Sequence, residues 1–63
     1  MIKVTRLNGK EFVLNAELIQ FLEETPDTVI TLLNHEKIVV KESSQEVIKR
    51  VTEYQREIRS FKR

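Results

Sequence analysis

A helix-start signal at Ser43 divides this chain into a longer strand-forming part and a shorter helical part. Ser43-Ser44-Gln45-Glu46 has the pattern of a capping box, in which the Ser43 hydroxyl accepts a hydrogen bond from a main-chain N–H and Glu46 reaches back. Beyond it, apolar residues recur at alternating spacings of four and three: Val47, Val51, Tyr54, Ile58 and Phe61, with Ile48 widening the stripe. This spacing predicts an amphipathic helix over about 44–60 that covers a core.

Asn8-Gly9 indicates a β-hairpin near the start of the chain. The segments 2–7 and 10–15 on either side are rich in β-favouring residues, and Asn-Gly favours a two-residue type I′ turn. Such a turn places Val4 opposite Val13, Thr5 opposite Phe12 and Arg6 opposite Glu11. In this register both faces of the hairpin carry apolar side chains, so one face meets the helix and the other needs a second cover.

Two further strands, 28–33 and 37–41, are predicted from their content of Val, Ile and Thr. They are joined around Asn34-His35, where His35 is expected to adopt a positive φ in the turn. Thr25-Pro26-Asp27-Thr28 precedes them as another turn, with Pro26 presetting φ at its first central position.

The segment 16–24 is compatible with two structures. Leu18, Ile19, Phe21 and Leu22 fit one side of a short helix, which Asn15 would cap. A bent strand over 18–24, with Ile19, Phe21 and Glu23 on one side, fits the same residues. The spacing of the apolar residues leaves both structures open.

Together these elements predict an α+β fold: a small antiparallel β-sheet of four to five strands, built from two hairpins and packed by one C-terminal amphipathic helix. We expect a single domain over residues 1–63, because below roughly 70–80 residues one core supplies only about 3–5 kcal/mol of net stability. Phe12, Phe21 and Tyr54 are expected in that core. There is no cysteine for a disulfide, so self-association into a homo-oligomer is the expected support for so small a core.

The start of the chain and its hydropathy predict a cytoplasmic protein without a membrane span. Lys3 and Arg6 interrupt the first apolar residues, unlike a signal peptide. No stretch approaches the roughly 20 apolar residues that cross a bilayer. The net charge of +1 conceals an asymmetry. Residues 1–48 carry five Lys or Arg against eight Asp or Glu, a net −3, whereas residues 49–63 carry six against two, a net +4.

The sequence lacks the patterns of catalytic and cofactor sites, so we expect a protein that is not an enzyme and holds neither metal nor cofactor. His35, the only histidine, has no nucleophile and orienting partner at a suggestive spacing. Glu23, Glu24 and Asp27 lack the ordered spacing of a calcium loop. Gly9 stands outside any Gly-rich phosphate loop.

The order of residues resembles a known family. The segments that carry the resemblance are IKVTRLNG at 2–9, Leu14-Asn15, Leu18-Ile19, EETPDTVITL at 23–32, VVKES at 39–43 and EVI at 46–48. They resemble the small bacterial flagellar FlbD family, which includes the swarming motility protein SwrD. The likeness covers about residues 1–51, and Thr-Pro-Asp-Thr after paired glutamates is its most specific part. Asn34-His35 stands where the family commonly has Asn-Gly.

The resemblance implies a cytoplasmic, non-enzymatic accessory protein of flagellar motility that supports motor power for swarming. The partner it implies is a flagellar motor or assembly protein, with a stator or rotor component as the natural candidate. The order from the strand over 18–24 through Ser43 and the helix is also similar to the later part of LytTR-type DNA-binding domains, which favours the strand over 18–24. The loops here carry Glu23, Glu24, Asp27 and Glu36, which argues against nucleic acid as a partner.

We therefore expect a protein-binding module. The residues proposed to form its surface are Arg6, Glu11, Thr25, Pro26, Asp27, Arg56, Arg59 and Phe61, with Pro26 and Asp27 shaping the turn that presents it. One alternative is a small nucleic-acid-binding regulator of flagellar genes, motivated by the charge of +4 after residue 48. A second alternative is a structural oligomer subunit, in which the same turn serves only the strand register.

Overall fold

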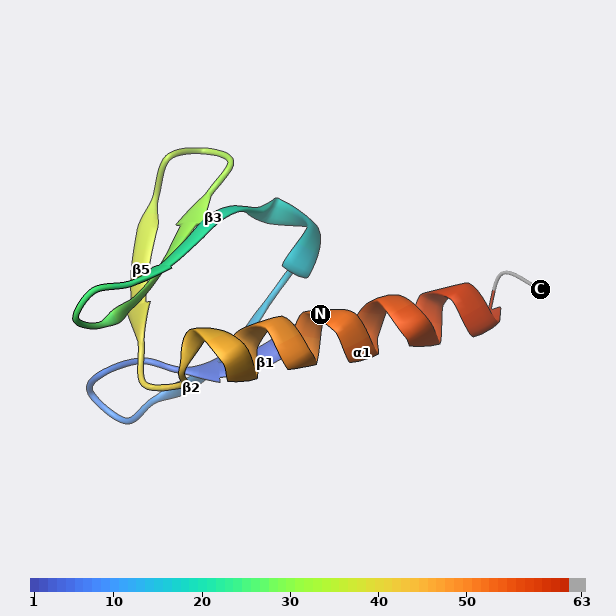
Figure 1. Cartoon of the computed structure of the whole chain (residues 1–63), viewed down its shortest axis with the longest axis horizontal. Helices are drawn as coiled ribbons and strands as arrows, with labels where there is room; N and C mark the ends of the chain where they lie inside the picture. The colour runs from blue at the N-terminus through green and yellow to red at the C-terminus, as the bar shows by residue number, and fades with distance from the viewer. Residues whose placement is uncertain (62–63) are drawn as a thin grey trace.

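The computed structural model describes the backbone of residues 1–61 and the side chains of residues 1–58. Within these residues, five strands, a short 3-10 helix and a long α-helix follow one another (Figure 1). Their bounds are β1 Ile2–Thr5, β2 Glu11–Leu14, η1 Ala16–Leu18, β3 Ile19–Glu24, β4 Thr28–Leu32, β5 Lys37–Val40 and α1 Ser44–Phe61. The predicted α+β fold of antiparallel strands and one C-terminal helix is confirmed.

The described strands form two small sheets that meet at one corner. β1 and β2 form a hairpin, and β3, β4 and β5 form a three-stranded antiparallel sheet in chain order. Arg6, just after β1, makes an isolated antiparallel bridge with Val40 at the end of β5. Next to it, the Lys41 N–H donates to the Thr5 carbonyl at 2.8 Å. The single predicted sheet is thus two sheets linked by this bridge.

The register of the first hairpin differs from the predicted one by one residue. Ile2 pairs with Leu14, Lys3 with Val13, Val4 with Phe12 and Thr5 with Glu11. The predicted pairs of Val4 with Val13, Thr5 with Phe12 and Arg6 with Glu11 are therefore wrong. The cause is a turn of three residues instead of two, closed by a hydrogen bond of 2.8 Å from the Arg6 N–H to the Lys10 carbonyl.

Gly9 accounts for the longer turn. It has a φ of 91°, and its N–H donates to the Arg6 carbonyl at 2.9 Å. A type I′ turn needs positive φ at both central residues, but Asn8 lacks it and instead accepts the Lys10 N–H on its side-chain oxygen at 2.9 Å. The result is the three-residue connection in which a left-handed glycine follows a type I turn.

This one-residue difference changes which side chains face the core, because successive residues of a strand point to opposite faces. Ile2, Val4, Phe12 and Leu14 share one face, whereas Lys3, Thr5, Glu11 and Val13 share the other. The hairpin therefore has one apolar face and one mainly polar face. The second cover that the predicted register demanded is not needed.

The segment 16–24 combines the two structures that the sequence left open. Asn15 accepts the Glu17 N–H on its side chain at 3.0 Å and caps the 3-10 helix η1. The chain then enters β3, so the strand prediction is confirmed for Ile19–Glu24, whereas Leu18 belongs to η1. The pairing with β4 is irregular between Ile19 and Phe21 and regular from Phe21 to Glu24.

The turn between β4 and β5 repeats the geometry of the first hairpin. The Leu32 N–H donates to the Glu36 carbonyl at 2.8 Å, and the His35 N–H donates to the Leu32 carbonyl at 2.9 Å. Asn34 accepts the Glu36 N–H at 3.0 Å, as Asn8 accepts that of Lys10. His35 takes the position of Gly9 with a φ of 75°, which confirms the predicted positive φ.

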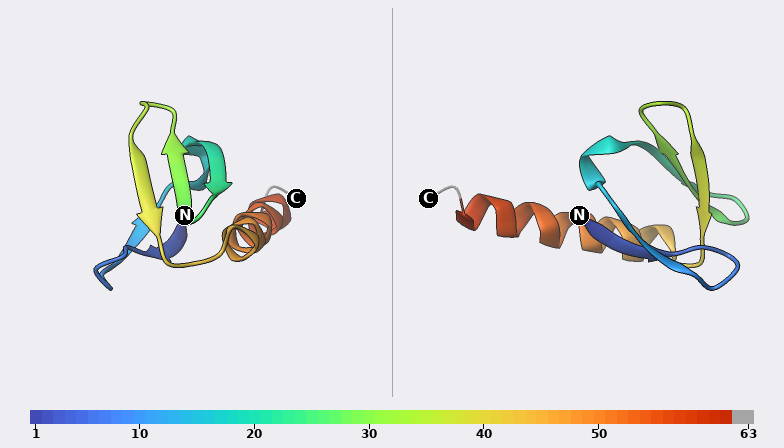
Figure 2. Two further views of the ribbon diagram at one scale, coloured as in Figure 1. Left: turned by 60° about the vertical axis from the view of Figure 1, so that its left-hand side comes forward. Right: turned by 180° about the vertical axis from the view of Figure 1, so that it is seen from behind.

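The core lies between the two sheets and the first half of α1 (Figure 2). Its fully or largely buried apolar members are Ile2, Val4, Leu14, Ala16, Ile30, Leu32, Val40 and Val47. Phe12 and Tyr54 pack partly buried against it, as predicted. Phe21 is 57% exposed, so its predicted place in the core is wrong.

The start of α1 is held by two side chains. Ser43 accepts the Glu46 N–H at 3.2 Å, as the capping-box pattern predicts. Glu46 does not reach back, because its carboxylate accepts from Arg50 Nε at 3.0 Å instead. The free Ser44 N–H is satisfied by Glu24 at the end of β3, at 2.7 Å. The second sheet therefore fixes the point at which the helix begins.

Candidate protein-binding surface

The three-stranded sheet has an inner face on the core and an outer face turned away from it. Cross-strand partners share a face, so the pairing assigns each residue. Leu22, Ile30 and Ile38 form a row on the inner face, where all three pack in or against the core. The alternating positions form the outer face, in two rows: Phe21, Thr31 and Lys37, then Glu23, Val29 and Val39.

The outer face has the composition of a protein-binding patch. Phe21 stands 57% exposed at one side, while Val29 and Val39 are half-buried. Glu23 and Lys37, both exposed, lie at opposite edges of the face. An apolar centre with an aromatic side chain and a charged rim is typical of protein interfaces. We call this face, defined by these five residues and by Thr31, which is buried between its neighbours, the outer sheet face.

Sequence reasoning missed the outer sheet face because it assigned Phe21 to the core. One signal was available. Phe21 and Leu22 are adjacent, and adjacent residues of a strand point to opposite faces. A strand over 18–24 therefore requires one of the two to face outward. Which one does so depends on the register with β4, which the sequence does not define.

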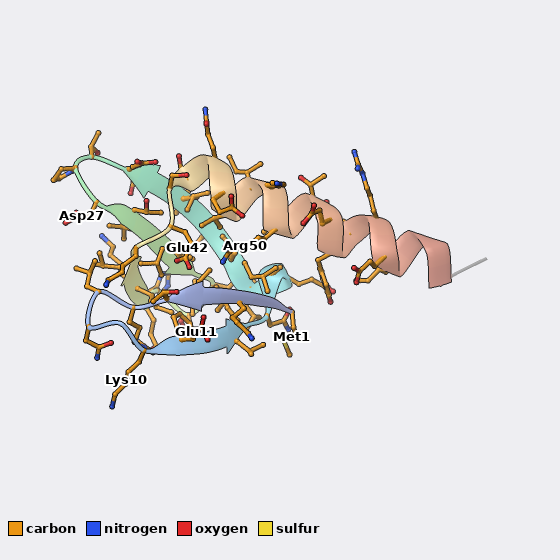
Figure 3. All side chains as sticks on the ribbon, turned by 90° about the horizontal axis from the view of Figure 1, so that it is seen from below. Met1, Lys10, Glu11, Asp27, Glu42 and Arg50 are labelled. Atoms are coloured by element: carbon orange, nitrogen blue, oxygen red, sulfur yellow. The ribbon has the colours of Figure 1, made fainter. Side chains whose placement is uncertain are left out.

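Four of the residues predicted for the site lie at one end of the molecule. The Arg6–Lys10 turn and the Thr25–Asp27 turn both lie at the end remote from the end of α1, where Figure 3 shows Lys10 and Asp27. Arg6 stacks over the Phe12 ring, with its guanidinium carbon 4.4 Å from the ring centre. Thr25, Pro26 and Asp27 are exposed, and the Thr25–Pro26 peptide is cis.

The remaining predicted residues lie elsewhere. Glu11 lines a groove of about 420 Å³ between β1 and α1, together with Glu42, Arg50, Glu53 and Glu57. Arg56 is exposed on α1. The helix continues through Arg59 to Phe61, whose side chains fall outside the described residues. The structure thus brings Arg6 and the Thr25–Asp27 turn to one end and leaves Glu11 and Arg56 apart from them.

A network of charged side chains fixes the hairpin against the helix (Figure 3). The Glu42 side chain, only 12% exposed, accepts from the Thr5 N–H at 2.9 Å and from the Thr5 hydroxyl at 2.8 Å. Arg50 approaches the same carboxylate at 3.2 Å, binds Glu46 and donates to the Lys3 carbonyl. Because these contacts join β1 to α1, they position both walls of the groove.

The carboxylates of this network and of the helix start are stabilised in their charged form. Burial of Glu42 raises its pKa, but the hydrogen bonds from Thr5 and the charge of Arg50 outweigh that effect, so the pKa of Glu42 lies below 4.5. The hydrogen bonds from Ser44 likewise lower the pKa of Glu24 below 4.5. Both groups are therefore anionic at neutral pH.

The free edge of β1 is covered by the same residues. Because Arg6 and Lys10 form a hydrogen-bonded pair, the main-chain groups of Thr5 and Lys3 point away from β2. Glu42 and Lys41 bind the N–H and carbonyl of Thr5, and Arg50 binds the carbonyl of Lys3. These contacts occupy three of the four main-chain groups of Lys3 and Thr5 through which another strand would pair.

Neither a metal-binding cluster nor a membrane-spanning helix occurs in the described part of the chain. No group of three or more His, Asp or Glu side chains there is placed to hold a metal ion. No helix in residues 1–61 is long and apolar enough to cross a bilayer.

Comparison with known proteins gives one match. The family model FlbD, described as flagellar and swarming motility proteins, matches residues 1–59. The match covers both hairpins, the outer sheet face and nearly all of α1. Searches of curated proteins and of solved structures found nothing that matches the chain.

Proposed function

The chain belongs to the FlbD family of flagellar and swarming motility proteins, and from that membership we propose that it serves motility by binding another protein through its outer sheet face. It acts without catalysing a reaction, in the cytoplasm, and its partner is a flagellar motor or assembly protein. A stator or rotor component is the partner that a role in motor power calls for.

The exposure of Phe21 carries this proposal. Leaving a phenylalanine in water forgoes about 1.5–3 kcal/mol of burial free energy. Among the described side chains, Phe21 is the only aromatic one that is exposed, which suggests a second role for it. Val29 and Val39 extend the apolar surface across two further strands. Exposed aromatic side chains in such patches are common among the residues that contribute most to binding energy.

The Thr25–Asp27 turn supports the outer sheet face by joining β3 to β4. Glu24 precedes this turn and binds the start of α1, so the turn and the helix start are held together. Thr25, Pro26, Asp27 and Arg6 then form a second, smaller contact region at the end of the molecule. Polar turn residues of this kind suit the rim of an interface better than its centre.

Comparison of two alanine variants in the native host tests the proposal. Phe21→Ala removes the aromatic side chain from the outer sheet face. Val13→Ala is the matched control, because Val13 is 62% exposed on β2 of the other sheet. A tagged copy of each is crosslinked in cells, captured and identified with its partners by mass spectrometry, and swarming is scored in parallel.

We expect Phe21→Ala to lose the captured motor or assembly protein and to swarm poorly, whereas Val13→Ala behaves as the unmodified protein. Both variants should melt within a few degrees of it, because exposed substitutions change stability by about 0.5 kcal/mol or less. If Phe21→Ala captures its partner and swarms normally, the outer sheet face is not the binding surface.

A further inference from the structure

An apolar groove runs beside α1, on the side opposite the charged network. It has a volume of about 290 Å³ and is lined by Ala16, Ile19 and Leu22 from η1 and β3. The helix supplies the rest of the lining: Val47, Ile48, Val51, Thr52 and Gln55. Ile48 is 55% exposed at its rim. This surface is separate from the outer sheet face, since Leu22 lies on the inner face of β3.

The second half of α1 extends past the body that the strands form. The molecule measures 39 Å along its longest axis but only 22 and 18 Å across, and Figures 1 and 2 show the helix projecting beyond both sheets. Val47, Val51 and Tyr54 reach the core. Ile58 lies on the same helical face, one turn further, where it is half-buried but is not among the apolar residues that pack on the core. The chain's own fold therefore leaves the apolar stripe partly uncovered.

A second row of side chains, which we call the seam, runs along α1 from the groove to the projecting part of the helix. Ile48, Val51, Gln55 and Ile58 follow one another at spacings of three, four and three. This is the spacing of the a and d positions of a coiled coil. Val51 and Ile58 also belong to the core-facing stripe, so the seam lies along the flank of that stripe. A second helix placed against it would cover Ile48 and Ile58 together.

We infer that this seam is the contact between two copies of the chain, with the two α1 helices antiparallel about a two-fold axis. In that arrangement Ile48 of each copy contacts Ile58 of the other copy, and Val51 of each copy contacts Gln55 of the other. The projecting end of each helix then lies over the groove of the other copy. A two-fold contact requires the same patch on both molecules. The seam meets that requirement because each copy supplies both members of every contacting pair.

Charge favours a second copy as the occupant. Residues 1–48 carry a net −3 and residues 49–63 a net +4. An antiparallel pair sets the basic end of each helix, which includes Arg56, over the acidic part of the other copy. The strand beside the groove ends in Glu23 and Glu24, and Glu17 lies in η1. A parallel pair would instead place the two basic ends side by side.

This inference stands apart from the proposed function, because it uses neither Phe21 nor any motility partner. Its first test is sedimentation equilibrium of the purified full chain. We expect the unmodified protein to be a dimer, and Ile48→Glu and Ile58→Glu each to raise the dimer Kd more than about tenfold. Val13→Glu, at an exposed apolar site on β2, away from the seam, should leave the Kd unchanged.

Ile48 and Ile58 are not among the buried core residues, so these variants are expected to fold, and far-UV circular dichroism checks that they do. A purified chain that is monomeric at every concentration overturns the inference. So does a dimer that both glutamate variants leave intact.

A second test fixes the orientation of the helices. The chain has no cysteine, so Ile48→Cys and Ile58→Cys each introduce a single thiol. Mixed and oxidised together, the two variants should form a disulfide between unlike chains. Each variant alone should crosslink poorly, since like positions in an antiparallel pair lie about 15 Å apart along the helix. Crosslinking of each variant with itself would show a parallel pair and overturn the arrangement.

Discussion

The Glu42 carboxylate binds both the main-chain N–H and the hydroxyl of Thr5, 37 residues earlier in the chain, at 2.9 and 2.8 Å. This pair joins the first strand to the residue just before the helix start. Arg50 completes the contact from the second turn of α1, at 3.2 Å from the same carboxylate. The first strand and the start of the helix, which are distant in sequence, are thus held together at one largely buried acid.

Replacing Glu42 with alanine should destabilise the protein by about 2 kcal/mol. The change removes two hydrogen bonds from Thr5 to a charged group, leaves the Thr5 N–H without its acceptor, and leaves Arg50 with only Glu46 and the Lys3 carbonyl as partners. Urea unfolding followed by circular dichroism measures the loss as a lower midpoint at unchanged slope. Glu53→Ala, an exposed acid on the same helix, is the control and should change stability by about 0.5 kcal/mol or less. Equal effects of the two substitutions would show that the Glu42 contacts do not stabilise the fold.

Stability should fall as the solution becomes acidic. Glu42 and Glu24 both have a pKa below 4.5 in the folded protein, so near and below that pH the unfolded chain binds more protons than the folded one. The stabilisation they provide is fully present above the unfolded pKa and is lost as pH falls through the folded values. Melting temperatures recorded between pH 7 and pH 3 should decline below about 4.5. Glu42→Gln should reduce the size of that decline, and a decline of the same size in the variant would contradict the assignment to Glu42.

The two similar turns should respond oppositely to substitution. His35→Gly should stabilise the protein by about 1 kcal/mol, because a side chain is unfavourable at a φ of 75° and glycine is not. Gly9→Ala should destabilise it by about 1 kcal/mol for the same reason, since an added Cβ would meet no atom within 4 Å and only the backbone conformation opposes it. Thermal melts of both variants measure the two shifts. Shifts of the same sign would exclude this explanation.

The register of the first hairpin can be tested with paired cysteines. Lys3 and Val13 are directly opposite at a position without main-chain hydrogen bonds, where side chains come closest. Lys3→Cys with Val13→Cys should therefore form a disulfide on mild oxidation, seen as a loss of free thiols. Val4→Cys with Val13→Cys should not, although a two-residue turn would place those residues opposite each other. The reverse result would restore the two-residue turn.

Most of the fold could be predicted because its signals are local. The capping residue Ser43, the spacing of apolar residues after it and the strand-rich segments before it each depend on a few neighbouring residues. The register of the first hairpin was not predictable from Asn8-Gly9 alone, because that pair is compatible with turns of two and of three residues. The alternation of Ile2 with Val4, and of Phe12 with Leu14, fits only the observed register if one face is to be apolar.

The candidate surface was less accessible to sequence reasoning. The Thr25–Asp27 turn and Arg6 were singled out as surface residues, and the structure places them at one end of the molecule. The outer sheet face was missed because the side on which Phe21 lies is decided by its pairing with Thr31, ten residues away. The contact of Glu42 with Thr5 has no local sequence signal, since neither residue belongs to a motif that would predict the other as its partner.

The covered edge of β1 has a consequence for how the protein behaves when it is crowded. An unprotected strand edge can recruit the same strand from other molecules and extend without limit into fibrils. Here a carboxylate, a guanidinium and a lysine main-chain N–H occupy that edge, so growth from β1 would first have to break charged contacts. Conditions that protonate Glu42 should therefore expose the strand and promote aggregation from this side of the sheet.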